Sequence, residues 1–523
     1  MCPIDLKNSF GMVMLALEQQ LMISASADKV SVKDLVMLAS ASYKRRYDEL
    51  GYIYNSLTKK EQYLDEFGAF VLELIGREPI SIRELLKRAC SHKDFQNNEA
   101  LKQILCLVSA LAADNFILIG KSKTEMKNND PKFSYGSTRS PLNKAQNVKG
   151  YLPHQKEFFF ERFKDRPRIL RFQMEITSKC NEKCVHCYHP ADWFVHKDID
   201  LNLGLKVLDE LKQEGTLTVC FSGGEAFLHK DFDRLLYRAR ENDFVIIVLT
   251  NATHISDYYI DVLKDVSPEE VQVSLYSMTP EEHDSITKIP GSHARTMEGI
   301  KRLMKENIFI SIGCPVMKGN KDCYKDVVKW ADANGIMVKT DFMLYACTDY
   351  DQSNLSNRLS IEEVEGLIRE TLQFSRSYKA TVDKKEALID PLSLIKKPPC
   401  GAGRDSLAMN ANGDYYFCPV FRPSVLGNPI TDSLQNVWRK SRPLLELRNV
   451  TWEDFPGCMK CEAFNFCSMC FARNSNENNG DPLKVNKHCC EISFLNKRIV
   501  EEYWKDTNNS SQPANKKRFK VAF

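Results

Sequence analysis

The sequence predicts an α/β protein whose centre is a partly closed barrel of six parallel strands with crossover helices. Two observations predict it: six short apolar segments lie between residues 169 and 343, and helical segments alternate with them. Strands joined by crossover helices pair in parallel within one sheet. A winged-helix-like unit precedes the barrel, and a loop-rich, cysteine-dense region follows it.

The expected strands are apolar runs bounded by helical segments or turn signals. They are Ile169–Ile176, Leu217–Phe221, Phe244–Leu249, Val271–Leu275, Phe309–Pro315 and Ile336–Met343. The helices expected between them include Leu203–Glu214, Phe232–Glu241, Arg295–Lys305 and Tyr324–Asn334. The barrel domain is placed at residues 161–350, a connecting region at 351–395, the cysteine-rich domain at 396–505 and a polar tail at 506–523.

The first third of the chain is predicted to hold a small separate unit. Residues 1–40 are expected to form a helical extension, with apolar stretches at Met12–Leu17 and Leu35–Leu38. The following elements are a hairpin, three helices and a strand: Arg46–Tyr54 with Gln62–Leu64, then Phe67–Ile75, Ile82–Ala89 capped by Ser81, Ala100–Ala113, and Phe116–Ile119. A polar linker is expected at 123–160.

Residues 41–122 resemble the PqqD-like peptide-recognition domain found in the biosynthesis of ribosomally made, modified peptides. The resemblance rests on YDELGYIYNSLTKKEQYLDEFGAFVLELI, ISIRELLKRA and LVSALAADNFILI. It implies that this unit binds the leader of a precursor peptide. A generic winged helix that binds DNA or only packs is the alternative.

Charge and hydropathy exclude several classes of protein. The net charge is +3 from 72 basic and 69 acidic residues, which favours neither nucleic acid nor a membrane surface as a partner. The N-terminal residues lack the form of a signal peptide, and no uninterrupted apolar stretch approaches the length of a membrane span. We therefore expect a cytoplasmic protein.

Eighteen cysteines in a chain of this size indicate metal or redox chemistry. Cys180, Cys184 and Cys187 follow the first barrel strand with the spacing C-x3-C-x2-C, and Tyr188 comes next. Three thiolates can hold three irons of a [4Fe–4S] cube and leave one iron open. The alternatives are a zinc site or a ferredoxin-type cluster with a fourth ligand, for which zinc could use His186 or His189.

This cysteine motif resembles that of the radical S-adenosylmethionine (AdoMet) superfamily, called radical SAM. The resemblance implies an oxidoreductase whose open iron chelates AdoMet and whose cluster cleaves it to a 5′-deoxyadenosyl radical. Further elements of the superfamily recur at strand ends, where parallel α/β sheets place their sites. They imply that AdoMet is bound by Gly223, Gly224, Glu225, Asn251 and Ser274, together with Tyr188. His283-Asp284 and Pro290-Gly-Ser-His293 match another recurrent loop.

A second group of cysteines resembles the SPASM signature. Cys400-x12-Gly413-x4-Cys418 is followed by Cys458-x2-Cys461-x5-Cys467-x2-Cys470, where the signature has x3 before its last cysteine, and then by Cys489 and Cys490. The resemblance implies two auxiliary [4Fe–4S] clusters: Cys400, Cys418 and Cys470 for the first, and Cys458, Cys461 and Cys467 with Cys489 or Cys490 for the second. Residues 390–399 contain no further cysteine, which leaves open whether the first has an open iron. A pair of zinc sites is the alternative.

These features together predict a maturase that modifies a precursor peptide, with thioether formation favoured and carbon–carbon crosslinking next. A flavodoxin or ferredoxin is the expected reducing partner. A maturase of a protein substrate, a non-catalytic iron–sulfur electron-transfer protein and a redox-sensing winged-helix regulator are the other interpretations. Pro419, where sulfatase-maturing relatives have an aspartate, disfavours that activity. The sequence names no catalytic acid or base.

Overall fold

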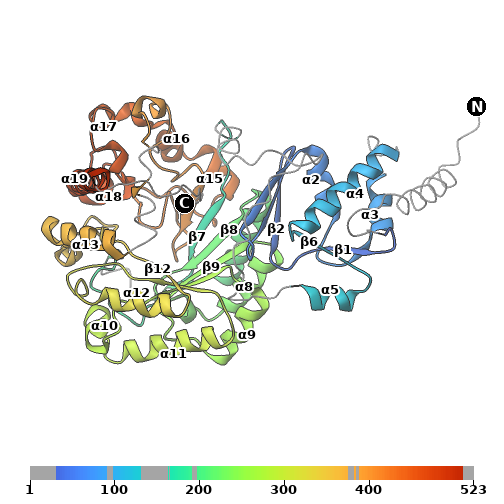
Figure 1. The fold of residues 1–523 in the computed structure, drawn as a ribbon, viewed down its shortest axis with the longest axis horizontal. Coiled ribbons are helices and arrows are strands. Elements are labelled where there is room, and N and C mark those ends of the chain that lie inside the picture. Colours follow the sequence, from blue (N-terminus) through green and yellow to red (C-terminus); the bar gives the residue numbers. More distant parts are fainter. Residues whose placement is uncertain are drawn as a thin grey trace, which may run out of the picture.

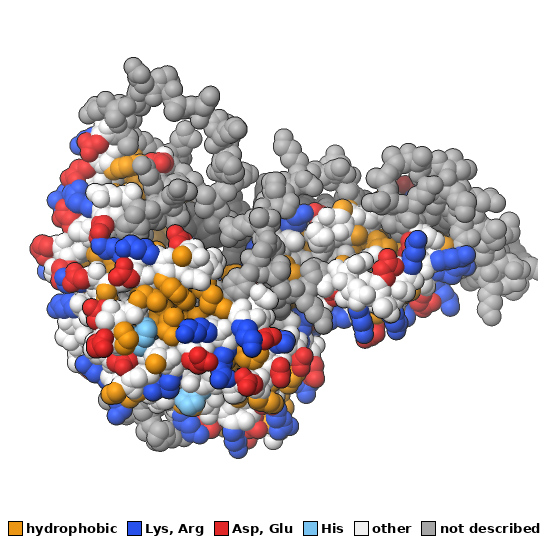
Figure 2. All heavy atoms as spheres, turned by 60° about the horizontal axis from the view of Figure 1, so that its bottom comes forward, with side chains coloured by type: hydrophobic (Ala, Val, Ile, Leu, Met, Phe, Trp, Pro, Cys, Tyr) orange, Lys and Arg blue, Asp and Glu red, His pale blue; other side chains and the backbone are white. Residues whose placement is uncertain are grey.

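The computed structural model describes residues 31–90, 98–130, 163, 165–190, 197–374, 382–383 and 388–509. Figure 1 shows three parts: an N-terminal unit at one side, a central sheet with helices, and a C-terminal region above the sheet. Among the helices described, none combines the length and apolar character needed to cross a lipid bilayer. Figure 2 shows acidic and basic side chains interspersed over the face that it presents.

The N-terminal unit contains two small antiparallel sheets and four helices among its described residues. One sheet has the order β2-β3-β4 and the other β5-β1-β6. The strands are β1 Leu35–Leu38, β2 Ser42–Tyr47, β3 Leu50–Asn55, β4 Lys60–Leu64, β5 Ile80–Ser81 and β6 Ile117–Gly120. The helices are α2 Glu66–Leu74, α3 Ile82–Ala89, α4 Asn98–Ala113 and α5 Lys123–Asn129. The predicted cap is confirmed, because the Ser81 hydroxyl accepts from Glu84 N at 3.1 Å.

Two expectations for this unit are wrong. Leu35–Leu38 is strand β1 rather than helix, and it pairs with both β5 and β6. A four-residue apolar run carries no period that separates helix from strand, so its sheet partners decide its structure. The expected linker begins with helix α5, because Met126 is buried against β6 and Asp130 accepts hydrogen bonds from Ser40. Residues 1–30 and 131–162 lie outside the described residues.

The six predicted barrel strands are confirmed as neighbours in one parallel sheet. They are β7 Arg171–Glu175, β8 Thr218–Ser222, β9 Val245–Thr250, β10 Glu270–Ser274, β11 Ile310–Gly313 and β12 Met337–Lys339. The full sheet has eight strands in the order β12-β11-β10-β9-β8-β7-β13-β14. Strand β13, Ser406–Met409, comes from the cysteine-rich region and pairs in parallel with β7, and β14, Tyr415–Tyr416, pairs antiparallel with β13. The sequence did not predict these two strands.

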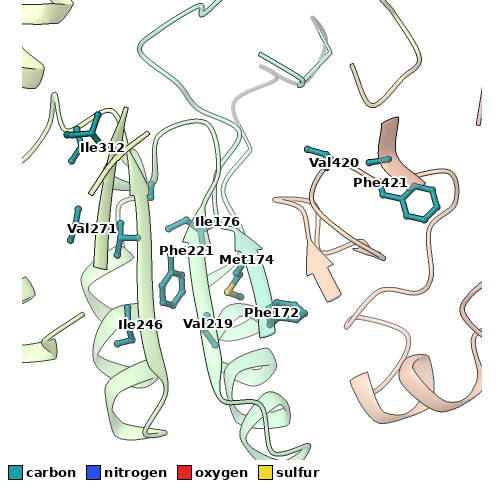
Figure 3. Packing of buried hydrophobic residues seen from close by; sticks show 14 of the residues in the cluster. Phe172, Met174, Ile176, Val219, Phe221, Ile246, Val271, Ile312, Val420 and Phe421 are labelled. Atoms are coloured by element: carbon teal, nitrogen blue, oxygen red, sulfur yellow. The ribbon is translucent and has the colours of Figure 1, made fainter. Parts of the chain in front are cut away.

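Helices surround this sheet, and all of them except α10 contribute to one continuous core. They are α7 Leu201–Gln213, α8 Phe232–Glu241, α9 Asp257–Val266, α10 Pro280–Thr287, α11 Ser292–Lys305, α12 Tyr324–Ala333 and α13 Ile361–Phe374. Figure 3 shows the core side chains of β7 to β11 together with Val420 and Phe421 of the C-terminal region. All belong to one buried hydrophobic cluster, so the cysteine-rich region shares its core with the barrel.

Besides β13 and β14, the cysteine-rich region contains short helices and one long helix, α19. These are α15 Leu434–Lys440, α16 Arg442–Asn449, η7 Trp452–Asp454, α17 Pro456–Met459, η8 Phe464–Phe466, α18 Phe471–Glu477 and α19 Lys487–Asn509. Helix α19 is longer at both ends than the expected Glu491–Trp504. It therefore includes the start of the predicted polar tail, and residues 510–523 lie outside the described residues.

The N-terminal unit is fixed to the amino ends of the barrel strands. Arg45 on β2 is buried and donates to the carbonyls of Thr216 and Asp243, which precede β8 and β9. Arg77 forms an ion pair with the Asp243 carboxylate. Tyr54 donates to Glu269, just before β10, at 2.7 Å. The unit thus lies at the end of the barrel opposite the carboxyl ends of the strands.

Candidate functional site

The loop that carries the first three cysteines leaves the carboxyl end of β7 and lies directly against the turn that follows β8. A Cβ atom on Gly224 would lie 2.2 Å from the carbonyl oxygen of Lys179 and 2.9 Å from the Cβ of Cys180. One on Gly223 would lie 2.3 Å from the carbonyl oxygen of Thr177. Any larger residue would push the cysteine loop away, so both glycines are required by close approach of two backbones.

The opposite side of the cysteine loop is held by the C-terminal end of α10. Lys183 N donates to the carbonyl of Thr287 at 2.9 Å. The Asp284 carboxylate accepts from the backbone N–H groups of Gly291 and His293 at 2.5 and 2.8 Å, which fixes the start of α11. The Asp284 carboxylate of the recurrent motif therefore joins α10 to α11 beside the cysteine loop.

The three thiols of this loop lie in a largely apolar, half-buried setting. The Cys184 sulfur is 3.8 Å from the Tyr276 hydroxyl and donates to the Glu182 carboxylate at 3.6 Å. Burial raises the pKa of Cys180 to about 12, and it also raises the pKa values of Cys184 and Cys187. The thiols are therefore protonated unless a cation replaces the protons, and iron is a cation that thiolates bind well.

Glu225 follows the two glycines and is almost wholly buried, with 1 % of its surface exposed. Its carboxylate accepts from the Thr250 hydroxyl and the Asn251 backbone N–H, both at 2.7 Å, and from Phe227 N at 3.2 Å. Burial raises the pKa of Glu225 to about 7. The side chain thus joins the end of β8 to the end of β9, and its predicted contact with the AdoMet ammonium remains a prediction.

The other predicted contacts of AdoMet lie along the same edge of the sheet. The Asn251 amide donates to Asn181 at 2.9 Å and accepts from Thr253, so it ties the cysteine loop to the end of β9. Ser274 ends β10 and lies two residues before Tyr276, whose hydroxyl is 3.8 Å from the Cys184 sulfur. The structure thus brings Gly223, Gly224, Glu225, Asn251 and Ser274 together beside the cysteine loop, at the carboxyl ends of neighbouring strands.

The cysteines of the second group separate into two sets. Burial raises the pKa of Cys418 to about 12, and the neighbouring thiols of Cys470 and Cys400 add to the rise. Burial likewise raises the pKa of Cys458 to about 11, with contributions from Cys467, Cys490 and Cys461. Within the part of the chain that the structure describes, no three Cys, His, Asp or Glu side chains converge on a single-ion site. The donors are sulfur atoms distributed over two sets, which is the donor chemistry of iron–sulfur clusters.

Comparison with known proteins identifies both cysteine regions. Residues 174–331 match the radical SAM superfamily, and residues 400–462 match the SPASM iron–sulfur cluster-binding domain. The chain carries a radical SAM domain followed by a SPASM domain. It is therefore a radical SAM enzyme that uses a [4Fe–4S] cluster with AdoMet and contains auxiliary clusters.

Several characterised proteins resemble the chain. The antilisterial bacteriocin subtilosin biosynthesis protein AlbA of Bacillus subtilis is 25% identical over 320 residues, which is 60% of this chain and 69% of AlbA. The AdoMet-dependent heme synthase of Methanosarcina barkeri is 23% identical over 343 residues, which is 62% of this chain and 96% of that protein. Among solved structures, Streptococcus suis SuiB bound to the precursor peptide SuiA has a TM-score of 0.57 at 15% identity, covering 87% of this chain and 99% of SuiB. The SuiB likeness shows the fold.

The structure also reveals a buried ion pair between the radical SAM and SPASM domains that the sequence did not predict. Arg422 of the SPASM domain lies 2.5 Å from the carboxylate of Glu175, at the end of β7. The His189 ring lies 3.9 Å from the same carboxylate, and the Tyr188 ring packs on the His189 ring with 4.5 Å between ring centres. Tyr188 is thus part of this pair's surroundings, and its predicted contact with AdoMet stays a prediction. Two residues 247 positions apart carry no sequence signal of their pairing.

A second arginine of the SPASM domain, Arg473, was also missed. It lies in the first turn of α18 and donates to the carbonyl of Met343 and to Asp341, both at 3.0 Å. Its guanidinium is 4.4 Å from the centre of the Tyr345 ring. Arg473 therefore joins the segment after β12 to the helix that begins at Cys470.

Proposed function

We propose that this enzyme modifies a ribosomally made precursor peptide by hydrogen abstraction, with a thioether crosslink as the product. The similarity to a bacteriocin biosynthesis protein carries the choice of substrate class. The presence of both an AdoMet-type cysteine loop and auxiliary cysteine sets is consistent with it, because crosslinking releases an electron that a cluster can accept. Carbon–carbon crosslinking is the second possible product.

For the first cluster we propose Cys180, Cys184 and Cys187 as ligands. They share one short loop, their protonated thiols need a cation to become thiolates, and the glycine turn lies against them. When bound, the cluster and AdoMet supply the 5′-deoxyadenosyl radical. Gly223 and Gly224 allow the close approach, and Glu225 would accept a hydrogen bond from the AdoMet ammonium. Asn251, Ser274 and Tyr188 complete the proposed site.

For the auxiliary clusters we propose the two cysteine sets as ligands. Cys400, Cys418 and Cys470 belong to one set, and Cys458, Cys461 and Cys467 to the other. The first set sits next to the Glu175–Arg422 pair, because Arg422 also donates to the carbonyl of Pro419 at 2.6 Å. This contact supports a position of the proposed auxiliary site close to the end of β7, from which the first cysteine loop begins.

The N-terminal unit is proposed to hold the leader of the peptide as an added strand along an edge of the β2-β3-β4 sheet. Its arginine contacts fix it to the amino ends of the barrel strands. A bound leader would tether the core peptide to the enzyme and raise its effective concentration at the active site, which the core peptide would reach by extending to the opposite end of the barrel. A flavodoxin or ferredoxin is the proposed electron donor.

A second candidate is modification of a cofactor precursor, because AdoMet-dependent heme synthases are also similar to the chain. This candidate predicts turnover of a tetrapyrrole and no need for the N-terminal unit. The peptide candidate predicts that separating this unit from the barrel abolishes modification of the full precursor.

The test is anaerobic co-expression with a short open reading frame encoded beside the gene, followed by high-resolution mass spectrometry of the peptide. Loss of two hydrogens per modification, absent with Cys184→Ala, would support a crosslinking maturase. Resistance of a peptide cysteine to alkylation would then distinguish a thioether from a carbon–carbon bond. An unchanged peptide in the presence of AdoMet cleavage would contradict the proposed substrate. Intact AdoMet in cluster-loaded protein would contradict the proposed roles of the three cysteines.

A further inference from the structure

Helix α19 begins with two consecutive cysteines, Cys489 and Cys490, in its first turn. Consecutive residues of an α-helix point roughly 100° apart around the axis, because a turn takes 3.6 residues. One thiol therefore cannot replace the other without rotation of the helix. The contacts of the two helix faces show what each thiol approaches.

The face of α19 that carries Cys490 meets the loop of the Cys458–Cys467 set. Lys497, seven residues further along this face, forms an ion pair with Glu462 at 3.3 Å. Trp504, fourteen residues further along, packs on Phe466 with 6.2 Å between ring centres. Glu462 and Phe466 each stand next to a cysteine of that set. Cys490 therefore faces Cys458, Cys461 and Cys467.

The face of α19 that carries Cys489 is buried against α18 and the shared core. Cys489 is 3 % exposed, and Ile492 and Ser493 on the same face are 2 and 4 % exposed. Figure 1 shows α18 and α19 beside each other at the C-terminal end of the molecule. The Cys489 side chain is thus part of the core that the barrel and the cysteine-rich region share.

A single asparagine fixes this placement. The Asn486 side chain accepts from Cys489 N at 2.9 Å and donates to the carbonyl of Arg473 at 3.1 Å. Asn474 accepts from Asn486 N at 2.9 Å, and its own N–H donates to the carbonyl of Cys470 at 3.0 Å. The start of α19 is therefore bound to the first turn of α18, and Cys470 is the N-cap of α18.

We infer that Cys489 is the fourth ligand of the auxiliary cluster held by Cys400, Cys418 and Cys470, and that Cys490 is the fourth ligand of the other. The inference rests on the proposed auxiliary clusters. Residues 390–399 offer no cysteine for the first position, and hydrogen bonds through Asn486 and Asn474 link the buried Cys489 to the start of α18 at Cys470. Cys490 already completes the set that contains Cys467, so Cys489 is left for the set that contains Cys470.

The consequence concerns the reaction. A [4Fe–4S] cube with four cysteine ligands has no open iron, so the first auxiliary cluster would not bind the thiolate of the peptide. Its role would be to accept the electron that is left when the sulfur–carbon bond forms, with the peptide thiol proton released to solvent.

The test uses a background with Cys180, Cys184 and Cys187 all replaced by Ala, in which only auxiliary clusters can form. The background protein should hold about eight irons. The electron–nuclear double resonance spectrum of the reduced background protein should show no coupling to added ¹³C-cyanide. Cys489→Ala should either lose about four irons or keep a cluster that binds ¹³C-cyanide, as electron–nuclear double resonance detects. Cys490→Ala should change the other auxiliary signal, and Cys106→Ala, on an exposed position of α4, should change neither.

The inference is overturned if cyanide couples to the background protein or if Cys489→Ala leaves iron content and spectra unchanged. Cys489→Ser, whose oxygen can still ligate iron, should keep the iron and shift the spectrum of one cluster only. Neither measurement requires a peptide, so failure of the proposed peptide modification would leave these spectra as they are. Zinc in place of iron in the background protein would overturn both the inference and the proposed auxiliary clusters.

Discussion

Replacement of Arg422 by Ala should destabilise the enzyme strongly, because it leaves a carboxylate buried without its cation. The side chains of Arg422 and Glu175 are 7 and 1 % exposed, and the ion pair joins the SPASM domain to β7. Burial raises the pKa of Glu175, and Arg422 opposes this rise. Removal of one partner from such a pair typically costs about 3–5 kcal/mol.

An independent bound on this cost comes from protonation. Without Arg422 the Glu175 carboxyl can avoid burial of a charge by taking up a proton. The ordinary pKa is 4.5, so protonation near pH 7.5 costs about 4 kcal/mol at roughly 1.4 kcal/mol per pH unit. The two figures agree, and we expect a loss of about 4 kcal/mol for Arg422→Ala.

Two further variants separate the charge effect from lost packing. Arg422→Ala combined with Glu175→Gln should cost only about 1–2 kcal/mol, because no buried charge remains. The coupling between the two substitutions should thus equal about 2–3 kcal/mol plus the cost of Glu175→Gln alone, which leaves Arg422 without its anion. In Arg422→Ala alone, the folded pKa of Glu175 lies above its unfolded value. The folded protein then stays protonated at Glu175 up to a higher pH than the unfolded protein does. The free energy of unfolding should therefore fall as the pH rises above about 4.5.

The measurement is pulse proteolysis in urea on anaerobically prepared protein, at several pH values and with circular dichroism as a check of folding. A loss below about 1 kcal/mol for Arg422→Ala would refute the argument. So would a double variant no more stable than Arg422→Ala, because the cost would then come from packing and not from the unpaired carboxylate.

Three other substitutions test the site and the domain contact. Gly224→Ala should lose about four irons and AdoMet cleavage, because its Cβ would lie 2.2 Å from the Lys179 carbonyl oxygen. The spectroscopic signals of the auxiliary clusters should remain. Full iron content by metal analysis would contradict this prediction. Glu225 has a pKa raised to about 7, so AdoMet affinity measured by calorimetry should increase between about pH 6 and pH 8 as the carboxylate forms, at most roughly tenfold per pH unit. Glu225→Gln should bind more weakly and lose this dependence, and an equal pH profile in both proteins would speak against the ammonium contact. Asp243→Asn should weaken the contact between the N-terminal unit and the barrel by about 2–4 kcal/mol, because Arg77 loses its carboxylate partner. Faster amide hydrogen exchange in β2 would show this weakening, and unchanged exchange would count against it.

Much of the fold was predictable because its signals are local. Each of the six barrel strands is an apolar run with helical segments beside it, and all six appear in one parallel sheet. The motif residues at the strand ends, such as Gly224 and Asn251, lie together because parallel strands end at one edge. Here a short stretch of sequence already contains the information that places each residue.

The remaining features depend on partners distant in sequence. Leu35–Leu38 becomes a strand because β6, about 80 residues away, pairs with it. Strand β13 extends the sheet of the radical SAM domain because it pairs with β7. Spacing alone determined that Cys489 and Cys490 follow the SPASM signature, but not which set each faces, since that depends on how α19 is rotated against α18. The sequence by itself determined the chemistry available to this enzyme, because cysteine spacing is local. Only the tertiary structure decided which groups share an environment, as in the Glu175–Arg422 pair, because burial and long-range contacts exist only once the chain has packed.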